Sequence, residues 1–151
     1  MIRGDDAFVR ATVEALELLK SRTPDAYALL EMHIGDVVSG QPSGVAISAL
    51  RHLPKTMIVM GLSYSEHSTV EYAGALAHET YHCELYRRAQ GGDPHGSVPT
   101  NVYSGKDAES LCLRYQCDVL RRLGLADAHI ARYESALESN WWEVPFDQRD
   151  W

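Results

Sequence analysis

The segment from Ser68 to Gln90 constrains the fold of this chain more than any other. Ser68 and Glu71 form a capping box, Ser-x-x-Glu, which is typical of a helix N-terminus. The run Gly-Gly-Asp-Pro at 91–94 predicts that the helix ends at about Gln90. Small or apolar side chains occupy positions 73 and 75–77, so we expect this helix to be buried deeply.

An HExxH motif lies within this segment, in the order His78-Glu79-Thr80-Tyr81-His82. Histidines four residues apart lie on the same face of a helix, so both imidazoles can reach one metal ion. Glu79 is rotated about 100° around the helix axis from His78, where it can act as a general base on a water molecule. The alternative interpretation is two surface histidines one turn apart on an ordinary helix.

A catalytic zinc site usually has three protein ligands, so the motif needs a third. A metzincin would place a histidine six residues after His82, but Arg88 stands there, which excludes that subclass. Glu109 lies 27 residues beyond His82, near the start of the next predicted helix. His95, in a glycine-rich stretch, and Asp118 are the other candidates.

Residues 45–124 resemble the gluzincin branch of the zincin metallopeptidases, and especially its compact members, the minigluzincins and the repressor-cleaving peptidases of bacteria. The resemblance implies one zinc ion (Zn2+) per chain, bound by His78, His82 and Glu109, with Glu79 polarising the water. It also implies a small sheet whose edge strand pairs with an extended peptide or protein substrate.

The sequence departs from the gluzincin pattern at one position. Many gluzincins carry Asp or Asn four residues after the ligand glutamate, where it orients a zinc-bound histidine. Leu113 occupies that position here. Either Asp118, Asp107 or a backbone carbonyl takes this role, or Glu109 is not the ligand.

Two cysteines lie close to the motif residues along the chain. Cys83 follows His82 directly, and Cys112 lies about one turn beyond Glu109. A thiolate would bind zinc strongly, but buried apolar packing is the commoner role of a free cysteine, and we expect that role for both.

Hydrolysis also needs a donor that stabilises the developing oxyanion. Tyr103, His95 and His129 are candidates, and no spacing rule selects among them. Tyr64 and His67 lie between a predicted strand and the motif helix, where the simpler interpretation is a connecting loop.

The rest of the chain predicts an α+β fold, in which a small mixed sheet packs on helices. Hydrophobic spacing and turn residues predict the following elements: helices at 5–20 and 24–38 (with a strand at 28–34 as the alternative), strands at 45–50 and 56–62, a loop at 91–105, and helices at 106–123 and 126–139.

Length and composition predict a single zincin-like domain over residues 1–151, because 151 residues are too few for two domains of ordinary size. The formal charge of −7 argues against nucleic acid and anionic membranes as partners. Three cysteines and an acidic N-terminus without signal-peptide features predict a cytoplasmic protein.

Residues 141–151 form an aromatic and acidic C-terminal tail that contains all three tryptophans. So much apolar surface is expected to dock, either on the first helices or in the substrate cleft.

The sequence therefore predicts a zinc-dependent metallohydrolase, in particular a peptidase. The alternative is a catalytically silent, zinc-stabilised interaction protein on the same scaffold. Substrate specificity and oligomeric state have no sequence signal.

Overall fold

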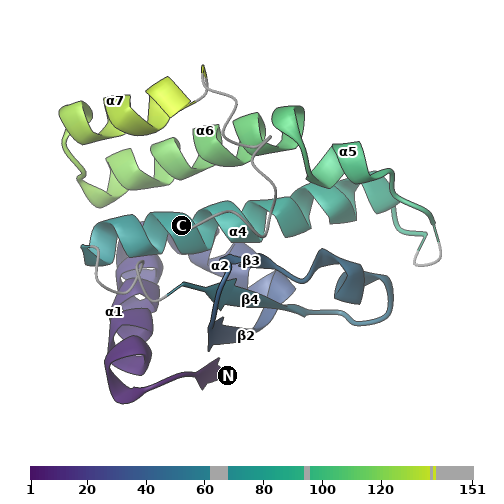
Figure 1. The fold of residues 1–151 in the computed structure, drawn as a ribbon, viewed down its shortest axis with the longest axis horizontal. Coiled ribbons are helices and arrows are strands. Elements are labelled where there is room, and N and C mark those ends of the chain that lie inside the picture. The colour runs from purple at the N-terminus through teal and green to yellow at the C-terminus, as the bar shows by residue number, and fades with distance from the viewer. Residues whose placement is uncertain (62–67, 94–95, 137, 139–151) are drawn as a thin grey trace.

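The computed structural model describes residues 1–61, 68–93, 96–136 and 138 (Figure 1). In chain order its elements are β1 (Ile2–Arg3), α1 (Asp6–Arg22), α2 (Pro24–His33), β2 (Ile34–Ser39), β3 (Gly44–Val45), the 3₁₀ helix η1 (Ile47–Arg51), β4 (Thr56–Met60), α4 (Thr69–Gln90), α5 (Thr100–Tyr103), α6 (Lys106–Leu123) and α7 (Asp127–Ala136). Tyr64, His67, His95 and the tail at 141–151 lie outside the described residues.

The strands among the described residues form a mixed sheet in the order β1-β2-β4-β3. β1 and β4 both pair with β2 in parallel, so that Val37 lies opposite Ile2 on one side and Ile58 on the other. β3 runs antiparallel to β4 at the edge. Helices pack on this small sheet, which confirms the predicted α+β class.

The prediction of a helix at 24–38 is wrong in its last third. α2 ends at His33, and β2 begins at the next residue, so the alternative strand at 28–34 is also misplaced. The register of β2 shifts between Ile34 and Asp36. Because a bulge changes the alternation of a strand, Ile34 and Val37 are both buried although they are three residues apart. That spacing resembles one face of a helix.

The predicted strand at 45–50 is also mostly wrong. Only Gly44–Val45 is extended, and the 3₁₀ helix η1 follows. Ile47 and Leu50 are both buried, and their separation of three residues matches the period of a 3₁₀ helix rather than the alternation of a strand.

The other predicted elements are present, with small differences in their ends. The strand at 56–62 is confirmed as β4, and the helices at 5–20 and 106–123 are confirmed as α1 and α6. The last helix, α7, is described only to residue 136. The predicted loop at 91–105 contains the short helix α5. None of the helices in the described part of the chain is long and apolar enough to cross a membrane.

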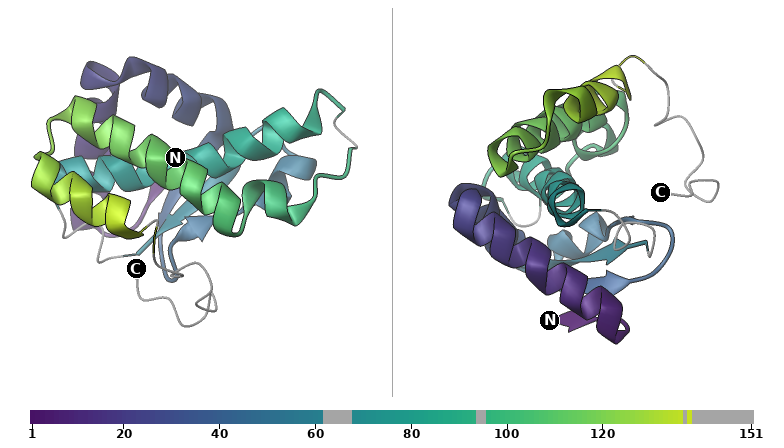
Figure 2. Two further views of the ribbon diagram at one scale, coloured as in Figure 1. Left: turned by 90° about the horizontal axis from the view of Figure 1, so that it is seen from above. Right: turned by 90° about the vertical axis from the view of Figure 1, so that its left-hand side faces the viewer.

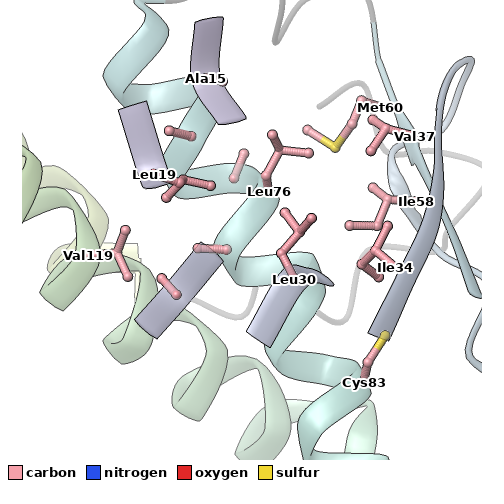
Figure 3. Packing of buried hydrophobic residues seen from close by; sticks show 14 of the residues in the cluster. Ala15, Leu19, Leu30, Ile34, Val37, Ile58, Met60, Leu76, Cys83 and Val119 are labelled. Atoms are coloured by element: carbon pink, nitrogen blue, oxygen red, sulfur yellow. The ribbon is translucent and has the colours of Figure 1, made fainter. Parts of the chain in front are cut away.

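α4 lies at the centre of the molecule, between α6 and the sheet (Figures 1 and 2). Ser68 caps it by accepting a hydrogen bond from the Glu71 backbone, and Gly91 ends it in the left-handed conformation (φ 62°), as the sequence predicts. Every residue from Tyr72 to His78 is buried. One face of α4 joins the main core, where Leu76 lies between α1 and the sheet (Figure 3). The face that carries the motif histidines turns to α6.

Candidate metal centre

His78 and His82 lie one turn apart on the face of α4 that contacts α6. Their Nε2 atoms are 3.3 Å apart, and their ring centroids are 5.1 Å apart. Both residues are buried, with exposed fractions of 9% and 6%. The alternative of two surface histidines is therefore wrong.

The other ring nitrogen of each histidine has a hydrogen-bond acceptor. His78 Nδ1 donates to Gln116 Oε1 at 3.0 Å, and His82 Nδ1 donates to the backbone carbonyl of Tyr103 at 2.8 Å. In a neutral imidazole the proton on Nδ1 leaves Nε2 as an acceptor. The two Nε2 lone pairs therefore point toward the same place. Because lone pairs repel each other, this close approach is favourable only if a cation or a proton lies between them.

Glu109, in the first turn of α6, reaches the same point. Its Oε2 lies 3.2 Å from His78 Nε2 and 3.5 Å from His82 Nε2. Its exposed fraction is 7%. Two imidazole nitrogens and a carboxylate oxygen thus form a buried triangle with sides of 3.2–3.5 Å.

Charge interactions in this cluster are strong. Burial alone would raise the pKa of Glu109, but the hydrogen bonds from His78 and His82 hold it well below its ordinary value. Burial alone would lower the pKa of His82, yet hydrogen bonds with Cys112 and Glu109 raise it well above its ordinary value. Both pKa shifts therefore favour the charged forms of His82 and Glu109 in the metal-free cluster.

Cys112 also belongs to the cluster. Its Sγ and one ring nitrogen from each of His78 and His82 all lie within 4.8 Å of one another, so these three buried residues could hold a metal ion. Burial raises the pKa of the Cys112 thiol, and the hydrogen bond with His82 opposes that rise. The Cys112 thiol therefore lies close to both imidazoles, whereas the sequence predicts a packing role for it.

Glu79 lies on the same helix as the two histidines but is only half-buried. Its charge is the smallest of the causes that raise the pKa values of His82 and Cys112.

The structure separates most of the other candidates from this cluster. Asp118 is 61% exposed and pairs with Arg122 at 3.6 Å, while Asp107 and His129 are exposed. Neither aspartate therefore serves as the partner of a motif histidine. The ring of Tyr103 packs edge-on against Tyr86, at a centroid distance of 5.3 Å, while its carbonyl binds His82.

Cys83 fulfils its predicted packing role. It is buried in the main hydrophobic cluster, and its side chain lies near Ile34 of β2 (Figure 3). Burial raises the pKa of its thiol to about 12.

Gln116 is the side chain that orients His78, the role for which the gluzincin pattern has Asp or Asn at the position of Leu113. Leu113 belongs to a second hydrophobic cluster, between α6 and α7. Gln116 instead binds His78 from two turns beyond Glu109. A backbone carbonyl, one of the predicted alternatives, binds the other histidine. Glu109, Cys112 and Gln116 are spaced at i, i+3 and i+7, which is the signal in the sequence that would have placed them on one helix face.

We compared the chain with family models, curated proteins and solved structures, and found no match to any of them.

Proposed function

We propose that this protein is a zinc-dependent hydrolase that cleaves peptides. The observation that carries this proposal is the convergence of the His78 and His82 Nε2 atoms, 3.3 Å apart, with both Nδ1 atoms already committed as donors. Fixing the tautomer through Nδ1 is the usual way in which a protein prepares a histidine to bind a metal through Nε2.

The geometry of the triangle supports zinc. Zinc bonds of about 2.0–2.1 Å to nitrogen and oxygen, directed to the corners of a tetrahedron, place neighbouring donor atoms about 3.3–3.4 Å apart. The three sides formed by His78, His82 and Glu109 measure 3.2–3.5 Å. Magnesium and calcium prefer all-oxygen sites, and two imidazoles are unsuited to them. The residues present therefore fit a zinc ion.

A zinc ion bound here would act as a Lewis acid that polarises a scissile carbonyl and lowers the pKa of water. Glu79 is the only acidic residue of the motif, and its half-buried position lets its carboxylate receive a proton from the attacking water. The same carboxylate then delivers that proton to the amine nitrogen of the leaving group. His78, His82 and Glu109 hold the centre, while Gln116 and the Tyr103 carbonyl fix the orientation of the imidazoles.

Peptides are the proposed substrates because of the motif and its resemblance to gluzincins. HExxH on a buried helix, followed by a glutamate on the next long helix, is the arrangement that those peptidases use. A structural zinc site has no use for a base, so the intact Glu79 favours hydrolysis over a silent binding protein.

The test is cleavage of a mixed peptide library by the zinc-loaded protein, with zinc content measured in each sample. Glu79→Gln should retain zinc and lose cleavage. Glu84→Gln is the matched control, because it removes the same charge from α4 at a residue that pairs with His33 and Arg88 instead. Cleavage by Glu79→Gln at the wild-type rate would overturn the assignment of the base.

A further inference from the structure

The proposed chemistry makes no use of Cys112, although its thiol lies in the cluster. Cys112 is fully buried, and its Sγ lies within 4.8 Å of a ring nitrogen of both motif histidines. It therefore lies close enough to both histidines to bind the same metal ion as they do.

The other two cysteines pack in hydrophobic clusters and so serve as a comparison for Cys112. Cys83 belongs to the main hydrophobic cluster and Cys117 to the second one. Cys112 is buried but belongs to neither of the clusters formed by the described residues. Polar groups act on its thiol instead: it forms a hydrogen bond with His82, and it lies in the field of the Glu109 and Glu79 charges.

The charge of the centre also favours a thiolate. His78, His82 and Glu109 are each less than a tenth exposed, so a divalent cation among two neutral imidazoles and one carboxylate would leave a net positive charge away from water. An uncompensated buried charge is costly. A second anionic ligand makes the set neutral, and a cysteine that coordinates a metal is deprotonated.

We propose that Cys112 is a metal ligand in the resting protein and that it holds the centre closed to water. This inference rests on the proposed zinc site and adds its regulation. With His78, His82, Glu109 and Cys112 all bound, zinc has four protein ligands, which is the arrangement of a closed site. The thiol would release its proton to solvent on binding the ion, and it would take a proton from solvent on leaving the ion, when the site opens to water and substrate.

Cobalt(II) binding tests this proposal separately from the proposed function. Tetrahedral cobalt(II) absorbs in the visible, which reports that the centre is occupied, and a cobalt–thiolate bond adds a charge-transfer band in the near ultraviolet. We expect both bands in the wild-type protein. Cys112→Ser and Cys112→Ala should keep the visible band and lose the near-ultraviolet band.

Cys117→Ser is the matched control, because Cys117 is a buried thiol on the same helix that packs in the second cluster. It should keep both bands. A visible band without a near-ultraviolet band in the wild-type protein would overturn the proposal for Cys112 and leave the metal site intact. Absence of both bands would contradict the metal site itself, and with it this proposal.

Cleavage gives a second readout of the closed site. Measured per bound zinc ion, the rate of peptide cleavage by Cys112→Ala should exceed that of the wild-type protein, and Glu79→Gln in the same background should abolish it. An equal or lower rate in Cys112→Ala, with metal still bound, would show that the thiol does not keep water out.

Discussion

Gly74 on α4 lies directly against Leu120 on α6, so closely that a Cβ atom at position 74 would be 2.5 Å from Leu120 Cδ2. Gly74 is one turn before His78, on the helix that supplies the histidines. Leu120 is one turn after Gln116, on the helix that supplies the carboxylate and the thiol. The close approach of these two helices is therefore what brings the donor atoms together.

Gly74→Ala should destabilise the protein, although alanine favours a helix interior by about 1 kcal/mol over glycine. Overpacking a closely packed contact costs about 1–3 kcal/mol, and the methyl group would push α6 away from α4. The free energy of unfolding in urea should fall, and so should zinc affinity, because Glu109 moves away from His78.

Gly35→Ala is the control for this substitution. A Cβ at position 35 would lie 3.5 Å from Lys55 Cβ and 3.6 Å from the Thr56 carbonyl oxygen, which are ordinary contacts. Its stability and its zinc affinity should stay close to those of the wild-type protein. A higher free energy of unfolding in Gly74→Ala would contradict the prediction, because it would show that the contact with Leu120 accommodates a methyl group.

The sequence predicts the parts of this site that lie on a single helix and misses the parts that depend on how two helices meet. The HExxH spacing places His78 and His82 on one face without any knowledge of the fold. The spacing of Cys112 and Gln116 could have placed them on one helix face with Glu109, but not shown that this face meets the motif histidines, because that depends on the rotation of α6 against α4. Similarly, Ile34 and Val37 show a helical spacing that a bulged strand satisfies once β1 and β4 pair on either side of it.

Gln116→Leu should weaken zinc binding by about 10–100-fold, because His78 loses the acceptor that fixes its tautomer. Gln116→Glu keeps an acceptor at the same place and should restore most of the affinity. Competition with a chromophoric chelator measures both, and circular dichroism confirms that both variants are folded. Equal affinities in all three proteins would show that the hydrogen bond does not prepare His78 for metal.

Glu109→Ala should weaken zinc binding far more than His95→Ala, because the Glu109 carboxylate already lies 3.2 Å from His78 Nε2. Asp118→Ala is a second control: it removes a carboxylate from the same helix, but an exposed one that pairs with Arg122. Titration calorimetry would measure the zinc affinity of all three variants. A larger loss of affinity in His95→Ala would move the third ligand from α6 into the loop.

Zinc affinity should rise with pH, because the raised pKa of His82 favours a proton on the imidazole that zinc must bind. Burial opposes a positive charge on His82, but hydrogen bonds with Cys112 and Glu109 keep its pKa well above the ordinary value, which favours the protonated imidazole in the metal-free protein. Below that raised pKa, each proton released on binding makes the affinity about tenfold higher per pH unit.

The stability of the metal-free protein should fall as the pH rises above neutrality, whereas zinc affinity rises. A raised pKa for His82 contributes stability that is complete below about pH 6.5, the value in an unfolded chain, and is lost as the pH rises through the folded value. The lowered pKa of Glu109 contributes stability above about pH 4.3, which is lost on acidification. The charged pair thus stabilises the metal-free fold most between these two values.

Calorimetric titration of zinc in buffers of different ionisation enthalpy counts the protons released and tests this linkage. At pH 7 the wild-type protein should release more protons than Glu109→Gln, because that variant lacks a carboxylate that raises the pKa of His82. Asp118→Asn, which removes a carboxylate that instead pairs with Arg122, should release as many protons as the wild-type protein. In Cys112→Ala, which has no thiol proton to release, a zinc affinity that does not change between pH 6 and pH 8 would show that His82 is already neutral in the metal-free protein.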